Sequence, residues 1–264
     1  MYKLVAIDCD GTLLTDNKEL TAITIETIKK ASNKVKIVIT TARAFYRVEE
    51  YLKKMDLLKD EQFTICFNGG SIIENQSKQE IKSCTFNAED VKELIELSKD
   101  FKTQILLYGF DSLIVENIPE KLRNNKKTNF KTMKLEELEA DQYSIYKIVF
   151  LNDPKKITEM RKIMPEEIKS KYEVTSSVPE YIEFVPKGIT KDKALEILCN
   201  KLNIERHEVI AIGDAENDIN MLKFAGTGIA MGNAEDFIKN IADDVTDSNN
   251  NNGVAKAIKK YIKI

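Results

Sequence analysis

Residues 5–14 read VAIDCDGTLL, a stretch that passes abruptly from apolar to acidic side chains. The apolar run at residues 4–7 predicts a short strand that is covered on both faces. Asp8 and Asp10 follow directly, although burying an unpaired carboxylate costs several kcal/mol. Side chains two positions apart in an extended segment point to the same side, so both acids can face one site. The stretch therefore predicts a partner for two carboxylates at the end of a buried strand.

Apolar strand-like runs alternate with amphipathic helical stretches in the first 80 or so residues and again in the last third of the chain. This alternation predicts a parallel sheet. We expect a Rossmann-like α/β core with helices on both faces, formed by residues 1–83 and 187–264. The expected strands are 4–7, 36–40, 63–67, 208–212 and 228–231, and the expected helices are about 21–31, 45–55, 191–202 and 218–225.

Residues 84–186 show a different pattern. Several of their strand-like runs are polar on one side, which is typical of an antiparallel sheet with one wet face. We interpret this region as an α+β domain inserted into the first. The polar, asparagine-rich stretch 248–253 is expected to be only a loop before a final helix. Within the insertion, the expected strands are 104–108, 112–116, 146–151 and 181–185, and the expected helices are 88–101 and 154–164.

Composition limits the partners. The net charge of −3 over 264 residues argues against nucleic-acid binding, because proteins that bind the phosphate backbone are usually basic. No apolar run approaches the roughly 20 residues needed to cross a bilayer, and residues 1–4 do not resemble a secretory leader. We therefore expect a cytoplasmic protein with no nucleic-acid or membrane partner, present as a monomer or weak homodimer.

Cysteine and histidine exclude several kinds of chemistry. The four cysteines form no CxxC pair, so we expect reduced, mostly buried thiols and neither a zinc site nor a redox pair. The single histidine, His207, excludes mechanisms that need two histidines, and its polar surroundings predict a surface loop. There is no GxxxxGK[ST] loop for a nucleotide. The cysteines are Cys9, Cys66, Cys84 and Cys199.

Acidic residues occur at the ends of two predicted strands. Ligands of open parallel sheets bind at the carboxyl ends of the strands, so Asp214 and Asp218 are expected near Asp8 and Asp10. Crowded carboxylates repel one another unless a cation separates them. A few carboxylates, completed by waters and a substrate oxygen, suit Mg²⁺. The acids could instead form a solvated turn or favour a helix N-terminus.

Three further residues could neutralise a phosphoryl group beside such a cation. Lys191, at the start of a predicted helix, offers a positive charge, while Thr41 and Asn217 offer neutral hydrogen bonds. Each has an ordinary alternative when taken alone: Lys191 is one of many lysines, and Thr41 could cap a helix. Their order along the chain, together with the acids, favours a site for a metal and a phosphate.

These residues resemble the motifs of the haloacid dehalogenase (HAD) superfamily, most closely its Cof-type phosphatases with a large cap inserted between motifs two and three. Residues 8–14 are similar to motif one, 41–43 to motif two, Lys191 to motif three and 213–218 to motif four. The resemblance spans nearly the whole chain. Further similar segments are 68–70, 231–234, 242–246 and 253–255.

The resemblance implies a Mg²⁺-dependent phosphatase acting on a small phosphomonoester. Asp8 would be the nucleophile and would form an aspartyl-phosphate. Asp10 would protonate the leaving alcohol and then activate water. It further implies that Asp8, the Asp10 carbonyl and Asp214 hold the metal, with Asp218 close by as a further candidate ligand.

The resemblance also implies the phosphate contacts. These would come from Lys191, Thr41, Asn217 and the backbone N–H groups of Cys9 and Ala42. The chain departs from the family pattern in two places. Ala42 stands where glycine is usual, which leaves less room beside the phosphate, and Asp192 stands where glycine often follows the motif-three lysine.

The implied cap at residues 84–186 should set the preference among sugar phosphates, nucleotides and cofactor phosphates. Tyr108 and Lys147 are polar candidates within it. The candidate substrate-binding residues are Arg43, Asn68, Gly69 and Glu183.

Three other functions stay open from the sequence. A phosphosugar mutase would need a second basic cluster, for which the charge run at residues 121–131 is a candidate. A phospho-aspartate receiver module, not an enzyme, would also carry acids, a threonine and a lysine. The length, the insertion and Asp10 count against that module, because Asp10 would speed loss of the phosphoryl group. A scaffold with an inactive site is disfavoured because every reacting group is present.

Overall fold

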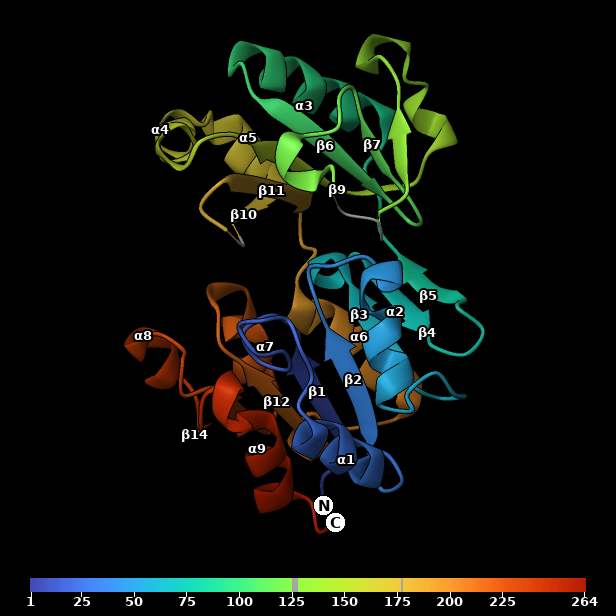
Figure 1. The fold of residues 1–264 in the computed structure, drawn as a ribbon, viewed down its shortest axis with the longest axis vertical. Coiled ribbons are helices and arrows are strands. Elements are labelled where there is room, and N and C mark those ends of the chain that lie inside the picture. The colour runs from blue at the N-terminus through green and yellow to red at the C-terminus, as the bar shows by residue number, and fades with distance from the viewer. Residues whose placement is uncertain (125–127, 177) are drawn as a thin grey trace. The chain divides into compact units, whose positions relative to one another are not determined.

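The computed structural model describes residues 1–124, 128–176 and 178–264. The chain forms two compact units, drawn in Figure 1. The core unit comprises Met1–Arg43, Val48–Lys82 and Thr190–Ile264, and the inserted unit comprises Ala44–Arg47 and Ser83–Ile189. The predicted α/β fold class is confirmed. Within the described ranges, no helix combines the length and the apolar character that a membrane span requires.

The core unit contains a mostly parallel sheet in the order β14-β13-β12-β1-β2-β3-β4-β5. Every residue of β1 and β12 is buried, as expected for strands covered on both faces. Strands β14, β13, β12, β1, β2 and β3 pair in parallel, and β4 pairs with β3 in the antiparallel direction. The strands are β1 (Leu4–Asp8), β2 (Lys36–Thr40), β3 (Phe63–Cys66), β4 (Ser71–Glu74), β5 (Glu80–Ser83), β12 (Val209–Gly213), β13 (Thr227–Ala230) and β14 (Asp244–Val245).

Helices cover both faces of this sheet (Figure 1). Leu4 and Ala6 of β1 pack with Leu195 of α6 and Met221 of α7 in one buried cluster. The helices α1 and α9 contact each other on the other face. The helices of the core unit are α1 (Ala22–Ala31), α2 (Phe45–Lys54, from Val48 onward), α6 (Lys191–Leu202), α7 (Ile219–Phe224), α8 (Asp236–Lys239) and α9 (Gly253–Tyr261).

The direction of the connections reverses at β1. This strand pairs in parallel with β2 on one side and with β12 on the other. Open parallel sheets bind their ligands at such a switch point, beyond the carboxyl ends of the strands. Asp8 is the last residue of β1 and lies in register with Thr40, the last residue of β2. The topology therefore places Asp8 at the position where a ligand is expected.

The inserted unit contains a second sheet in the order β10-β11-β9-β6-β7-β8. Its registered pairs are antiparallel except β7–β8. The strands are β6 (Gln104–Gly109), β7 (Leu113–Val115), β8 (Phe130–Thr132), β9 (Ile145–Leu151), β10 (Tyr172–Thr175) and β11 (Tyr181–Pro186), and the helices are α3 (Ala88–Asp100), α4 (Pro154–Ile163) and α5 (Glu166–Lys171).

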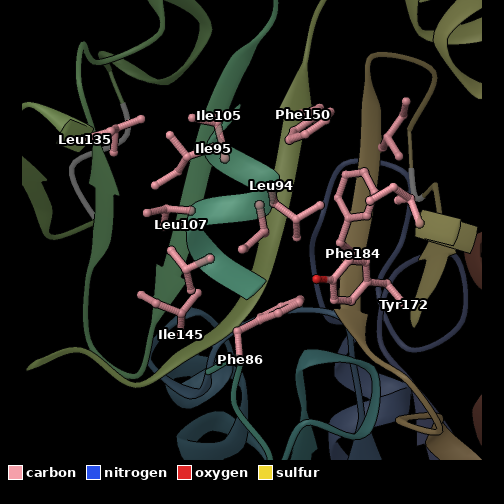
Figure 2. Close-up of a cluster of buried hydrophobic side chains, with 14 of the residues drawn as sticks. Phe86, Leu94, Ile95, Ile105, Leu107, Leu135, Ile145, Phe150, Tyr172 and Phe184 are labelled. Carbon is pink, nitrogen blue, oxygen red and sulfur yellow. The ribbon is translucent and has the colours of Figure 1, made fainter. Parts of the chain in front are cut away.

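The inserted unit has its own hydrophobic core, shown in Figure 2. Leu94 and Ile95 of α3 pack against Leu107 of β6 and Phe150 of β9. The rings of Phe150 and Phe184 pack in a tilted arrangement, with an interplanar angle of 59° and their centroids 4.7 Å apart. Each such side chain contributes roughly 1.5–3 kcal/mol when it is buried. All buried members of this cluster belong to the inserted unit.

Candidate active site

A buried lysine joins two buried aspartates at the end of β1. Lys191, the first residue of α6, is 1% exposed. Its Nζ lies 2.5 Å from Asp8 Oδ1 and 2.7 Å from Asp218 Oδ1. A lysine buried this fully needs such partners, because an unpaired buried charge costs several kcal/mol. The interpretation of Lys191 as an ordinary surface lysine is therefore wrong.

The charges of this triad shift the pKa values of its members. Burial raises the pKa of Asp8 well above its usual value, and the neighbouring charge of Asp218 raises it further, while Lys191 opposes both. Burial alone would lower the pKa of Lys191, but the charges of Asp218 and Asp8 outweigh burial and raise it. The Lys191 ammonium group thus stays charged at neutral pH, and its contact with a phosphoryl group stays a prediction.

Asp214 lies beside the triad and is held by the loop after β1. Thr12 Oγ1 donates to Asp214 Oδ1 at 2.6 Å. Gly11 has φ of +85°, and a Cβ atom there would lie 2.3 Å from Asp214 Oδ2. The glycine is therefore required both by the backbone conformation and by the close approach of Asp214. Burial raises the pKa of Asp214 to about 6, with Asp218 adding to the effect and Thr12 opposing it.

The carboxylates of Asp8, Asp214 and Asp218 fit a small cation. One oxygen of each lies within 4.8 Å of the others. Asp218 Oδ2 accepts hydrogen bonds from the backbone N–H groups of Asp214 and Ala215 at 3.0 and 3.1 Å, and its Oδ1 is paired with Lys191. Asp218 is thus fully buried and accepts three hydrogen bonds, whereas Asp214 is only partly buried and has one short contact, from Thr12, so Asp8 and Asp214 are the better candidate ligands. An oxygen-only donor set of this kind suits Mg²⁺.

Asp10 faces two basic side chains. Arg43 donates from Nε to Asp10 Oδ2 at 2.7 Å and from Nη2 to Oδ1 at 2.6 Å, and Lys18 Nζ lies 2.9 Å from Oδ1. Partial burial would raise the pKa of Asp10, but the hydrogen bonds and charge of Arg43 outweigh it and lower that pKa. The sequence did not predict this pairing, and a role for Arg43 in substrate binding stays a prediction.

The candidate phosphate-binding residues lie on loops of the same unit. Thr41 is buried, and its Oγ1 accepts from the Arg43 backbone N–H at 3.1 Å. Asn217 Nδ2 donates to Asn68 Oδ1 at 3.0 Å, so the 68–70 loop and motif four meet. Gly69, at φ +110°, approaches the start of α6, since a Cβ atom there would lie 2.4 Å from Thr190 O. Their contacts with a phosphate stay predictions, as do those of Cys9 and Ala42.

The thiols and the histidine do not contribute reactive groups. All four cysteines are free, and Cys9, Cys66 and Cys199 are buried. Burial raises the pKa of the Cys9 thiol, so at neutral pH it is not a thiolate. His207 is exposed and lies 3.2 Å from Glu205.

Glu183 belongs to the inserted unit, where it forms a buried ion pair. Its Oε2 lies 3.2 Å from Lys147 Nζ, and both side chains are less than a tenth exposed. The Lys147 ammonium group also lies 4.8 Å from the centre of the Tyr108 ring. Of the predicted basic run, Lys121 is paired with Glu180. Lys126 and Lys127 lie outside the described residues; Arg123 and Lys131 are the other members.

A comparison with protein families decides the assignment. The model of haloacid dehalogenase-like hydrolases matches residues 5–258. The chain belongs to this family. The resemblance seen in the motifs is confirmed. The chain is an enzyme of the phosphatase class, as expected from the sequence.

Relatives and solved structures align with nearly the full length of this hydrolase. The protein named "Putative phosphatase YxeH" from Bacillus subtilis is 31% identical over 270 residues, which cover 99% of each chain. The 5-amino-6-(5-phospho-D-ribitylamino)uracil phosphatase YcsE from the same species is 30% identical and covers 98% of this chain and 96% of its own. A crystal structure of a haloacid dehalogenase-like hydrolase from Bacteroides thetaiotaomicron superposes with a TM-score of 0.89 at 30% identity, covering 98% of this chain and 99% of that one.

Proposed function

We propose that this hydrolase is a Mg²⁺-dependent phosphatase that cleaves a small phosphomonoester through an aspartyl-phosphate on Asp8. The observation that carries the proposal is the placement of Asp8. It ends the central strand at the switch point of the sheet, with Lys191 Nζ 2.5 Å away and Asp214 beside it. A nucleophilic carboxylate, a fixed positive charge and a second carboxylate for a cation are the groups that phosphoryl transfer requires.

In the first step, a carboxylate oxygen of Asp8 attacks phosphorus and the bond from phosphorus to the leaving oxygen breaks. Asp10, in its protonated form, gives its proton to that oxygen. In the second step Asp10 takes a proton from water, the water oxygen attacks phosphorus, and Asp8 and inorganic phosphate are released. Mg²⁺, held by Asp8, Asp214 and the Asp10 carbonyl, would neutralise charge on the phosphoryl oxygens.

The remaining residues bind and orient the phosphoryl group. Lys191 supplies a charge that needs no reorganisation, since Asp8 and Asp218 already hold it in place. Thr41, Asn217 and the backbone N–H groups of Cys9 and Ala42 would donate to the phosphoryl oxygens. Asp192 adds a negative charge next to Lys191 in the first turn of α6 and is expected to weaken phosphate binding.

The substrate we propose is a phosphorylated sugar, polyol, nucleotide or cofactor, with the polyol class supported best. The substrate after which YcsE is named carries its phosphate on a ribityl chain. Glu183, Lys147 and Tyr108 of the inserted unit could bind hydroxyl groups of such a leaving group. Arg43, Asn68 and Gly69 are the candidates from the core unit.

The test is a phosphate-release screen across sugar phosphates, polyol phosphates, nucleotides and an aryl phosphate, with Mg²⁺ present. We expect phosphate release from several members and none from Asp8→Asn. Glu183→Gln should change the ranking of substrates but not the aryl phosphate rate. The matched control is Glu173→Gln on β10, whose carboxylate pairs with Lys187. Failure of wild-type protein to release phosphate from any member would refute the proposed function.

A further inference from the structure

The asparagine-rich stretch 248–253 does more than connect two elements. It contains a short 3-10 helix, η7 (Asn249–Asn251), and its amide groups contact the loop that follows Asp10. Asn249 is 5% exposed, and its Nδ2 donates to Leu14 O at 2.9 Å and to Asp16 Oδ1 at 3.0 Å. The expectation of a plain connecting loop is therefore incomplete.

Two neighbouring asparagines complete the attachment. Asn250 Nδ2 donates to Asp16 Oδ2 at 2.8 Å, and the Asp16 backbone N–H donates to Asn250 Oδ1 at 3.2 Å. Thr21 Oγ1 donates to Asn252 Oδ1 at 2.6 Å. The loop between β1 and α1 is thus bonded at several points to a segment more than 200 positions away in the sequence.

Asn249 also fixes Asn233, which reaches the candidate metal site. The Asn249 backbone N–H donates to Asn233 Oδ1 at 3.0 Å. This bond turns the Asn233 amide nitrogen toward Gly11 O, at 2.9 Å, and toward Asp214 Oδ2, at 3.4 Å. The opposite orientation would place the Asn233 oxygen against two acceptors, so the assignment of its amide atoms follows from its partners.

The two oxygens of Asp214 therefore have donors from different segments. Thr12 Oγ1 contacts Oδ1 at 2.6 Å, and Asn233 Nδ2 lies 3.4 Å from Oδ2. Donors of this kind orient a carboxylate before a metal binds, and their removal typically lowers metal affinity by about 10–100-fold. The same asparagine holds Gly11, one residue after Asp10, so one side chain supports both the acid–base loop and the metal ligand.

We propose that Asn233 and Asn249 are positioning residues for the metal site, with Asn249 acting through Asn233 and through residues 14–16. This inference rests on the proposed function, since it assumes that Asp214 binds a divalent cation. Neither asparagine reacts with substrate. Their effect is to reduce the freedom of Asp214 and of the loop before the cation binds.

The test measures binding of Mn²⁺, a substitute for Mg²⁺, to metal-free full-length protein by the electron paramagnetic resonance signal of the free ion. Asn233→Ala should raise the Mn²⁺ dissociation constant by about tenfold or more, and Asn249→Ala should raise it as well. The Mg²⁺ concentration needed for half-maximal activity should rise in parallel, while KM for an aryl phosphate at saturating Mg²⁺ stays unchanged. Asn251→Ala is the matched control, because Asn251 is exposed in the same turn.

The outcomes separate this inference from the proposed function. If wild-type protein binds no Mn²⁺, the metal site of the proposed function fails and this inference fails with it. If wild type binds Mn²⁺ and folded Asn233→Ala binds it equally well, only the inference is overturned, even if the melting temperature falls. Asn249→Ala opens a buried position and can unfold the chain. Asn233 is exposed, so its variant decides the question.

Discussion

Arg43 binds both carboxylate oxygens of Asp10 in a two-point contact, at 2.7 and 2.6 Å. Such a paired contact is stronger and more directional than a single ion pair. It holds Asp10 as a carboxylate, and its pKa is lowered accordingly. A carboxylate in this state can accept a proton from water, but it must leave Arg43 and gain a proton before it can act as an acid. The two proposed roles of Asp10 therefore require two arrangements of this pair.

Replacement of Asp10 should affect substrates according to their leaving group. Asp10→Asn removes the proton donor and the later base, and general acid–base catalysis is typically worth roughly 10²–10⁴-fold. A nitrophenolate leaves without a proton, so formation of the aspartyl-phosphate from an aryl phosphate should be affected least. We expect a rapid burst of nitrophenol and then a slow phase, measured by stopped-flow absorbance.

Alkyl phosphates supply the comparison for this variant, because an alkoxide leaves poorly without a proton. Their release should be slowed more than that of the aryl phosphate. Equal slowing of both substrates without a burst would contradict the role of Asp10. Asp8→Asn should show no burst with either substrate, since no covalent intermediate can form.

Activity should depend on a small divalent cation. EDTA should abolish phosphate release, and Mg²⁺ should restore it. Ca²⁺ should fail to restore it, because its larger and looser coordination shell does not hold the reacting groups in line. The measurement is the initial rate of aryl phosphate hydrolysis after dialysis against each ion. Full activity in EDTA-treated, metal-free protein would refute the metal site.

Much of the core unit was predictable because its strands are apolar and continuous. The runs at β1, β2 and β12 are buried on both faces, so composition alone marks them as strands. The short or polar elements were not predicted. β5 reads EIKS and is largely exposed, and α8 has only four residues. Neither is long enough to show a clear period.

The candidate site was predictable where its residues follow directly from strand ends. Asp8 ends β1 and Asp214 follows β12, and the parallel pairing of these two strands brings both acids to the same edge of the sheet. The pairing of Arg43 with Asp10 and the contact of Asn233 with Gly11 were not predicted. These contacts depend on the path of loops between elements, and loops carry no periodic signal in the sequence.

Low pH should reduce the stability that Glu93 of the inserted unit contributes through its bonds to Lys171 and Tyr172. Lys171 and Tyr172 both bond to Glu93, and these hydrogen bonds lower the pKa of Glu93. A carboxyl group with a lowered folded-state pKa contributes stability above its unfolded pKa of about 4.3, and loses it as pH falls through the folded value. Glu93→Gln should therefore destabilise the protein at pH 7 by less than about 1 kcal/mol, as for other partly exposed ion pairs.

The difference between wild type and Glu93→Gln should vanish as the pH falls below about 4. Urea denaturation followed by circular dichroism at several pH values measures it. Glu159→Gln, at an exposed position of α4, is the control and should show no such pH-dependent difference. A gap between Glu93→Gln and wild type that stays constant from pH 7 to acid would show that charge on Glu93 is not responsible.

Gly11 should be needed for activity more than for stability. In Gly11→Ala the new Cβ would lie 2.3 Å from Asp214 Oδ2, so Asp214 must move. Positive φ adds strain of roughly 1–3 kcal/mol.

Gly188 separates the strain of positive φ from the close approach to Asp214, because its φ is +78° but nothing lies within 4 Å of an added Cβ. We expect both variants to lower the melting temperature, by about 2–4 °C for each kcal/mol lost. Only Gly11→Ala should lose Mg²⁺ affinity and kcat/KM, by about 10–100-fold. If Gly188→Ala lost activity to the same extent, general strain would account for the effect, and the close approach of Gly11 to Asp214 would have no special role.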